Sequence, residues 1–415
     1  MNTIAPVVAV YALLVLLWGA RRLFVAVFRR RLTFLTPQYG GLASLAPPPL
    51  VSIIIPAKDE EEAIGPCLES VLAQDYANLE VIVIEDRSRD RTAEVIQAIA
   101  RRDPRVRLIR NDRLPLGWTG KTHALVRAAG EARGEWMWFL DADTRHHPAT
   151  LSVMLEFARR EGGAEMVSTL MGMRNESFWE RVVQPLGGII LMSMFDLFRA
   201  NRTGDARGGF ANGQSILVRR AAYEAVGGHA AVRDQFLEDV QLGRLLKARG
   251  HSIKVAMAPG LSTTRMYTSL GGITRGWSRI YYGASGPNAA RLLRSQLSLL
   301  GTSMSAYLVP WLLIAAGSFG AGGGALAAAW GLNLLHLALV HDTMFHLYGF
   351  TGSDRRYLVL YPLSCLVVVY TLARATAMCF THRVTWRGTH YRRQYKVHPA
   401  SDRAGLEPHA SLVHH

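Results

Sequence analysis

The sequence predicts an α/β domain, built on a mostly parallel sheet with helices on both faces, together with transmembrane helices. Three observations predict this fold class. An uncharged apolar segment lies near the N-terminus, apolar strands alternate with helical segments from residue 51 onward, and long apolar segments return after residue 290. Of the 415 residues, 49% are hydrophobic and 19% are charged, so part of the chain is expected to lie in lipid.

The first apolar segment is expected to cross the membrane. Residues 4–20 carry no charge, and the segment extends to residue 27 if the side chains of Arg21 and Arg22 extend to the membrane–water interface. A cleaved signal peptide would carry its positive charge before the apolar run and a small-residue cleavage site after it. Here the arginines follow the run, so we predict an uncleaved anchor over residues 1–28. The N-terminus is then outside and the next domain is cytoplasmic.

A basic, proline-rich linker is expected over residues 29–50, because the prolines of LAPPPL fix the backbone outside helix and central strand. The next domain is expected over residues 51–262. Its strands are predicted over residues 51–55, 81–84, 106–110 and 136–140, and its helices over 61–73, 91–102 and 122–133. This alternation indicates a parallel sheet covered on both faces, whose ligands bind beyond the carboxyl ends of the strands.

The last third of the chain is expected to lie at and in the membrane. We predict an interfacial amphipathic segment over residues 263–296, membrane segments over 297–380 and a basic cytoplasmic tail over 381–415. The candidate spans are residues 297–317, 319–340 and 357–380. One span before the domain and three after it would place the basic tail outside, against the positive-inside rule. One late segment is therefore expected to be tilted, re-entrant or interfacial, either at the glycine-rich residues 317–324 or around Arg374.

Acidic residues recur after the predicted strands and once more in QFLEDVQLG. They are Asp59, Asp86, Asp141, Asp143, Glu238 and Asp239. Any one of them can be an acid that the dipole favours at a helix N-terminus. Their recurrence at successive strand ends favours a functional site.

Asp141 and Asp143 are the strongest metal candidates, because two carboxylates after the strand WMWFL can offer oxygen ligands to Mg²⁺ or Mn²⁺ while phosphates fill the other positions. We expect the nearby His146 and His147 to be solvent-exposed. The three cysteines show neither a disulfide framework nor zinc spacing, and Cys67 is expected to be a buried thiol.

The segment LPLGWTGKT, residues 114–122, ends like a phosphate-binding loop. That motif requires a glycine where Pro115 stands, so a backbone nest of the usual kind cannot form. Lys121 remains a point charge that can pair with a phosphate.

The motifs VSIIIPAKDEE, VIVIEDRSRDRT, GWTGK, FLDADT and FLEDVQLGRLLKARG occur in this order over about residues 50–255 and resemble those of family 2 glycosyltransferases with the GT-A fold. The resemblance implies that Pro56, Ala57, Asp59 and Asp86 contact the nucleotide of a nucleotide-sugar, with Asp86 on its base. It also implies that Asp141 and Asp143 hold the diphosphate through Mg²⁺ or Mn²⁺, and that Asp239 of the Glu238–Asp239 pair is the catalytic base. One base and one metal suffice for a single displacement, which inverts the sugar carbon.

Two later segments bear on the acceptor. Residues 271–284 stand where processive and lipid-directed members carry Gln-x-x-Arg-Trp; Arg275, Trp277 and Arg279 supply residue types for substrate binding, but the glutamine is missing. An amphipathic interfacial helix is an equal alternative. The tail VTWRGTHYRRQY, residues 384–395, resembles a basic element of members that use hopanoid, carotenoid or ceramide-type lipid acceptors, and GWTGK favours the first two.

Together these features predict inverting transfer of a sugar, from a UDP-sugar on family expectation, to a membrane lipid at the cytoplasmic face of the inner membrane. The alternatives are a processive polysaccharide synthase and a non-catalytic membrane binding module, which would not need Asp141, Asp143 and Asp239. The net charge of +15 gathers beside apolar segments and no nucleic-acid-binding motif occurs, which excludes nucleic acid as the expected partner.

Overall fold

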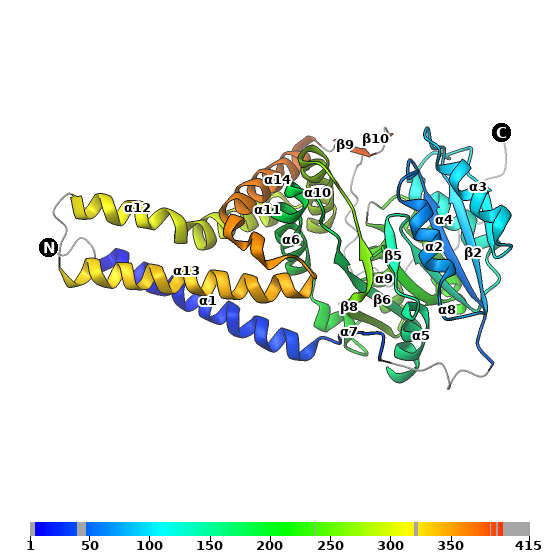
Figure 1. Ribbon diagram of the computed structural model, residues 1–415, viewed down its shortest axis with the longest axis horizontal. Coiled ribbons are helices and arrows are strands. Elements are labelled where there is room, and N and C mark those ends of the chain that lie inside the picture. Colours follow the sequence, from blue (N-terminus) through cyan, green and yellow to red (C-terminus); the bar gives the residue numbers. More distant parts are fainter. Residues whose placement is uncertain are drawn as a thin grey trace, which may run out of the picture.

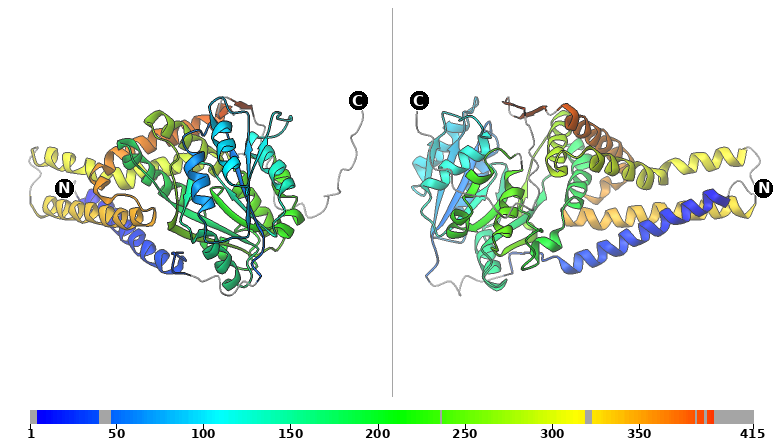
Figure 2. Two further views of the ribbon diagram at one scale, coloured as in Figure 1. Left: turned by 45° about the vertical axis from the view of Figure 1, so that its right-hand side comes forward. Right: turned by 180° about the vertical axis from the view of Figure 1, so that it is seen from behind.

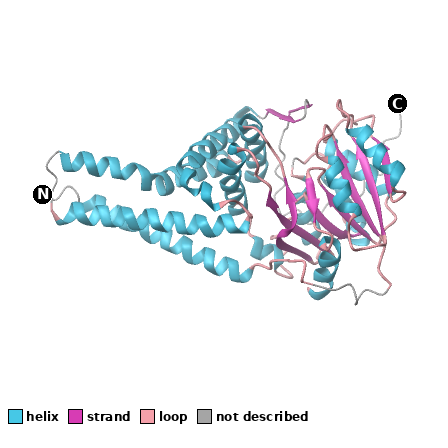
Figure 3. Cartoon of the chain, viewed as in Figure 1, coloured by secondary structure: helices cyan, strands magenta, loops and turns pink. Residues whose placement is uncertain are grey.

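The computed structural model describes residues 5–39, 47–235, 237–318, 323–381, 383–386 and 389–392. A sheet with its covering helices forms one end of the molecule, and long helices extend away from it (Figures 1 and 3). Both parts of the predicted fold class, the α/β domain and the apolar helices, are confirmed within these residues.

The sheet has the strand order β3-β2-β1-β4-β7-β6-β8-β5. Neighbours among β3, β2, β1 and β4 are parallel, as are β6 and β8, whereas β7 is antiparallel to both of its neighbours and β5 to β8. The strands predicted from the sequence therefore form the parallel part. The strands are β1 (Val51–Ala57), β2 (Leu79–Glu85), β3 (Val106–Arg110), β4 (Trp136–Leu140), β5 (Thr144–His146), β6 (Met166–Met173), β7 (Ser215–Arg219) and β8 (Ile253–Thr264).

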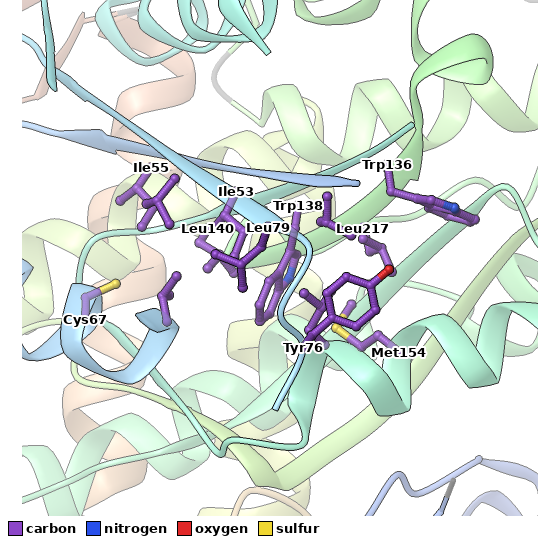
Figure 4. Packing of buried hydrophobic residues seen from close by; sticks show 14 of the residues in the cluster. Ile53, Ile55, Cys67, Tyr76, Leu79, Trp136, Trp138, Leu140, Met154 and Leu217 are labelled. Carbon is purple, nitrogen blue, oxygen red and sulfur yellow. The ribbon is translucent and has the colours of Figure 1, made fainter. Parts of the chain in front are cut away.

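Helices cover both faces of this sheet, which explains why its strands are apolar without alternation. Ile53 and Ile55 of β1 point into one core, shown in Figure 4, while Ile54 points into the core on the opposite face. The helices of the domain are α2 (Ile64–Leu72), α3 (Thr92–Arg102), α4 (Gly120–Glu131), α5 (Thr150–Arg160), α6 (Phe178–Ser193), α7 (Leu197–Asn201), α8 (Arg220–Ala225), η2 (Gly228–Val232) and α9 (Glu238–Ala248).

The remaining helices form the membrane-side part. They are α1 (Ala5–Arg31), α10 (Leu270–Ser285), α11 (Ala289–Ser298), the π-helix η3 (Leu299–Met304), α12 (Ser305–Ser318), α13 (Gly324–Phe350), η4 (Arg355–Leu360) and α14 (Tyr361–Thr381). Among the described residues, three helical windows are long and apolar enough to cross a membrane, namely Val8–Arg31, Ala289–Ala315 and Arg355–Thr381.

Helices α1 and α13 pack side by side and run in the same direction. The Tyr11 hydroxyl accepts a hydrogen bond from Asn333 at 2.7 Å, and further along both helices Arg22 pairs with Asp342 and lies 2.8 Å from His346. The indole of Trp18 donates to the carbonyl of Thr302 at 2.6 Å, which joins α1 to the π-helix. These polar contacts link α1 to α13 and to the π-helix.

Helix α14 behaves differently from α1, α12 and α13. Its buried residues recur at helical spacing, at Tyr361, Cys365, Val368, Leu372 and Ala375, and they pack with α6, α10 and α11 in one core. In Figures 1 and 2 it stays close to the α/β domain, while α1, α12 and α13 project away. Of the two positions suggested for the irregular late segment, this geometry favours the one that contains Arg374.

The expectation for His146 was wrong. Because β5 pairs with β8, the strand turns Arg145 outward and His146 inward, where its ring lies 2.9 Å from both Ser262 Oγ and Thr144 Oγ1. Burial lowers the pKa of His146 to about 3, so the ring is neutral. His147 is exposed as expected.

Cys67 is fully buried, as predicted, and burial raises the pKa of its thiol to about 12. In the tail, β9 (Arg383–Trp386) pairs antiparallel with β10 (Thr389–Arg392). Residues 382, 387–388 and 393–415 of the predicted cytoplasmic tail lie outside the described residues.

Gly134, between α4 and β4, tests the packing of the sheet. An added Cβ there would lie 2.5 Å from the Ser52 backbone nitrogen and 2.7 Å from the Leu50 carbonyl oxygen. Because neither backbone atom can move freely, we expect Gly134→Ala to lower the free energy of unfolding by about 1–3 kcal/mol. Thermal unfolding of the detergent-solubilised chain measures this.

Gly130→Ala is the matched control for that experiment. A Cβ at the exposed Gly130 meets nothing within 4 Å, and alanine favours the helix by about 1 kcal/mol. Gly130→Ala should therefore keep or raise the Tm. Equal Tm values for the two variants would show that the close approach at Gly134 is not real.

Candidate active site

A cavity of about 710 Å³ opens at the carboxyl ends of β1 and β4, between the sheet and helices α6 and α10. Its size is that of a typical small-molecule site. The wall toward β1, β2 and β4 is polar. The opposite wall, toward the membrane-side helices, is apolar and comes from β6, β8, α6 and α10; it contains Leu170, Met171, Met173, Leu191, Met192, Met257, Met266 and Ile280.

Nearly every site residue predicted from the sequence lines this one cavity. They are Pro56, Ala57, Asp86, Lys121, Asp141, Asp143, Glu238, Asp239, Arg275, Trp277 and Arg279. Asp59 is different: it is exposed, its φ is 52°, and its Oδ1 accepts from the Arg89 backbone at 2.8 Å. In this structure Asp59 therefore ties the loop after β1 to the loop after β2.

Asp86 is buried and firmly oriented. Its carboxylate accepts from Arg87 at 3.0 Å and from the Asn111 amide at 2.7 Å. An added Cβ at Gly120, the first residue of α4, would lie 2.7 Å from Asp86 Oδ2. Gly120, the second glycine of GWTGK, therefore allows α4 to approach this carboxylate closely.

Lys121 joins two acidic positions that are far apart in the sequence. Its Nζ lies 2.8 Å from Asp141 Oδ1, after β4, and 2.9 Å from Glu238 Oε1, at the start of α9. Burial alone would lower the pKa of Lys121, but the carboxylates of Asp141, Glu238 and Asp239 outweigh it and raise that pKa well above its usual value. The ammonium is charged at neutral pH.

Asp239 lies at the N-terminus of α9 with both oxygens held by backbone donors. Oδ2 accepts from the Gly213 N–H at 2.6 Å and Oδ1 from the Val240 N–H at 2.8 Å. Burial, together with the neighbouring Glu238, raises the pKa of Asp239 to about 7, against the opposing effects of Lys121 and the two N–H groups. The proton affinity of Asp239 is thus raised well above that of an exposed aspartate.

Asp141 and Asp143 lie in the short turn between β4 and β5, and both line the cavity. Their carboxylate oxygens are ligands that suit a hard divalent cation. Among the described residues, no group of three or more His, Cys, Asp or Glu side chains could hold a metal.

Helix α10 lines the cavity and also packs against α6. Trp277 is buried against Gly187 of α6, whose added Cβ would lie 3.1 Å from the indole. Arg279 donates to the Tyr267 hydroxyl at 3.0 Å, and the ring of Tyr267 fills the space beside Gly276. Residues 271–284 were predicted to be either a substrate-binding segment or an amphipathic interfacial helix, and a helix that also lines the cavity is compatible with both.

The segment GFANGQ, residues 209–214, was not predicted to belong to the site, yet residues 210–214 line the cavity. Gly213 positions Asp239, and Gly209 allows the loop to lie directly on the α9 backbone at Arg244. The signal that could have found this segment is the group of small residues just before β7. The methionine-rich wall carried no motif.

Comparisons with known proteins match this part of the chain. Residues 52–227 match the family described as Glycosyl transferase family 2. The beta-monoglucosyldiacylglycerol synthase of Nostoc sp. is 30% identical over 183 residues, covering 43% of this chain and 38% of that protein. The 4,4'-diaponeurosporenoate glycosyltransferase of Staphylococcus aureus is 26% identical over 260 residues, covering 61% and 67%. The chain thus spans well under half of the first of these relatives.

Among solved structures, a mannosyltransferase from Pyrobaculum calidifontis in complex with GDP-Man and Mn²⁺ aligns with a TM-score of 0.47 at 19% identity, covering 86% of this chain and 98% of that one. A glucosyl-3-phosphoglycerate synthase from Mycobacterium tuberculosis aligns with a TM-score of 0.40 at 19% identity, covering 61% and 85%.

The raised pKa of Asp239 makes a prediction about stability. Its pKa rises from 3.8 to about 7 on folding, so its contribution to stability is present at low pH and is lost as the pH rises through about 7. Asp239→Asn removes this titration. We therefore expect the Tm of the variant minus that of wild type to increase between pH 5.5 and pH 8.5.

Thermal unfolding across this pH range is the measurement. His146 and His229 titrate in both proteins and cancel in the difference. A difference that does not change with pH would contradict the raised pKa.

Proposed function

Since residues 52–227 form a family 2 glycosyltransferase domain, we propose that the chain transfers a sugar from a nucleotide-sugar to the hydroxyl of a membrane lipid, with inversion at the sugar carbon. One observation carries this proposal. A single cavity joins the acidic cluster at the strand ends to an apolar wall on the membrane side. The acidic cluster would bind the polar, charged donor, and the apolar wall would bind the apolar acceptor.

The donor is assigned to the polar wall. Pro56, Ala57 and Asp86 would contact the nucleoside, with UDP proposed on family grounds. Asp141 and Asp143 would hold Mg²⁺ or Mn²⁺, which when bound neutralises the charge that develops on the leaving diphosphate. The N-terminus of α4, capped by the Thr119 side chain, directs backbone N–H groups and Lys121 toward the same region.

The base is assigned to Asp239. It would take the proton of the acceptor hydroxyl while that oxygen forms the new bond to the sugar carbon and the bond to the diphosphate breaks. Glu238 is engaged by Lys121 at 2.9 Å, which supports a division of roles between the two neighbours. A single carboxylate base with direct attack gives inversion.

The acceptor is assigned to the apolar wall formed by β6, β8, α6 and α10. This wall faces the helices that reach into the membrane, so a lipid can present its hydroxyl to Asp239 and keep its apolar body beside Met173, Leu191 and Met266. The two relatives described above are named for glucosyldiacylglycerol and diaponeurosporenoate. A hopanoid, a carotenoid or another lipid with a hydroxyl is the proposed acceptor class. The missing glutamine of Gln-x-x-Arg-Trp weighs against a processive polysaccharide synthase.

The proposed location is the inner membrane, with the catalytic domain in the cytoplasm. Contacts from Tyr11 to Asn333 and from Arg22 to Asp342 show that α1 and α13 run in the same direction. Helix α12, which precedes α13 in the chain, runs in the opposite direction. Among the described residues one apolar window of spanning length lies in α14 and none lies in α13, but α14 packs with α6, α10 and α11 whereas α13 projects away beside α1. If α1, α12 and α13 therefore cross the bilayer and α14 stays at its surface, the domain and the chain after α14 lie on one side. That side carries Arg29, Arg30 and Arg31, as the positive-inside rule requires.

The function is tested by mass spectrometry of lipids extracted from cells with the wild-type chain, with Asp239→Asn and without the protein. We expect a lipid that differs by one sugar to depend on the wild-type chain. In vitro, Asp239→Asn should keep nucleotide-sugar binding and lower kcat by roughly 10²–10⁴-fold, because an amide cannot accept the proton. In the wild type, kcat/KM should rise with pH through about 7.

Glu238→Gln serves as the comparison and should reduce kcat less. If Glu238→Gln is inactive and Asp239→Asn is not, the roles of the two residues are reversed. If both remain active, the base lies elsewhere.

The topology is tested by reporters fused after Arg31, after Gly323 and after Tyr395. With α1, α12 and α13 as the spans, we expect cytoplasmic, external and cytoplasmic signals respectively. An external signal after Tyr395 would show that α14 also crosses the membrane.

A further inference from the structure

Lys121 occupies a position that phosphate binding alone does not explain. Its ammonium lies 2.8 Å from Asp141 Oδ1 and 2.9 Å from Glu238 Oε1, with only 17% of its side chain exposed. Asp141 is also the first carboxylate of the proposed metal site. A cation therefore already sits on one of the oxygen ligands that the metal would need.

Two of the other basic side chains that line the cavity have partners away from Asp141. Arg87 pairs with Asp86 at 3.0 Å, and Arg279 donates to the Tyr267 hydroxyl at 3.0 Å. Lys121 is held in place by its helix, because Thr119 caps α4 and the Thr122 hydroxyl donates to the Arg233 carbonyl at 2.7 Å. The contact with Asp141 is thus a built feature of the site.

We propose that Lys121 is an internal cation that occupies Asp141 until the donor arrives and then exchanges this carboxylate for the donor's diphosphate. The proposal rests on the proposed function, in which Asp141 and Asp143 hold a divalent metal. A metal ion arriving alone meets a positively charged ammonium on Asp141, and like charges repel. A metal ion arriving with a diphosphate brings negative oxygens that attract the ammonium away.

The position of Lys121 suits this exchange. It is the second residue of α4, a helix of 12 residues, so a phosphate that reaches Lys121 also meets the backbone N–H groups and the positive end of the helix dipole. The consequence is that metal and nucleoside diphosphate bind cooperatively. Metal alone is kept out of the site, because Lys121 already compensates the charge of Asp141.

The experiment measures Mn²⁺ binding to the full-length chain in detergent, without nucleotide, from the electron paramagnetic resonance signal of free Mn²⁺. Lys121→Met removes the competing cation, so we expect Mn²⁺ alone to bind about tenfold tighter than to wild type, within the usual range of coupling between sites. With saturating Mn²⁺, UDP and GDP should each be tested, and the one that binds wild type should bind Lys121→Met about tenfold more weakly.

Two controls keep the test sharp. Lys254→Met removes another lysine–carboxylate pair, at 2.9 Å from Glu161 and outside the cavity, and should bind Mn²⁺ as wild type does. Lys121→Arg keeps the charge and should show no gain in Mn²⁺ affinity, which also separates loss of charge from a folding defect.

Unchanged or weaker Mn²⁺ binding in Lys121→Met would overturn the exchange while leaving the proposed metal site intact. Asp143→Ala distinguishes the two hypotheses. If the Mn²⁺ bound by Lys121→Met is retained when Asp143→Ala is added, the metal is held elsewhere, and both the proposed metal site and the exchange are wrong.

Discussion

The contact of the Lys121 ammonium with Asp141 and Glu238 is the interaction on which the rest of the site depends. It joins the end of β4 to the start of α9, segments about 100 residues apart in the chain. Carboxylates gathered at one cavity repel one another unless a cation lies between them. The start of α4 is in turn tied to the chain before α9, because the Thr119 N–H donates to the Arg233 carbonyl at 3.0 Å. Charge compensation and backbone contacts therefore reinforce the same arrangement.

The second constraint is the joint between the sheet and the membrane-side helices. Tyr281 of α10 donates to the Gly187 carbonyl of α6 at 3.0 Å, and Ser278 of α10 donates to the Thr371 carbonyl of α14 at 3.0 Å. The helices that form the apolar cavity wall are thus packed directly onto α14. The proposed lipid acceptor would meet a wall whose position is fixed by the same core that holds α14 at the domain.

The sequence predicted the parallel half of the sheet because strands that are buried on both faces appear as continuous apolar runs. Strands β3 and β4 occupy the predicted residues 106–110 and 136–140. It predicted Asp86, Asp141 and Asp143 of the cavity because they directly follow strands of this half. His146 was misplaced because pairing of β5 with β8, about 115 residues later, decides which way it points. The methionine-rich wall of the cavity and the buried face of α14 were not predicted. Both form by packing between segments that are distant in the sequence, so no local sequence pattern indicates them.

The two adjacent acids at the start of α9 show how surroundings separate chemically similar groups. Neighbours on a helix point about 100° apart, so Glu238 reaches Lys121 while Asp239 turns to the Gly213 N–H. A carboxylate with an ordinary pKa is a weak base at neutral pH, and its proton affinity has to rise before it can help remove a hydroxyl proton. Burial beside Glu238 raises the pKa of Asp239 to about 7, while two backbone donors fix its orientation. Asp239 therefore combines a raised proton affinity with a fixed orientation, the two properties that the proposed base requires.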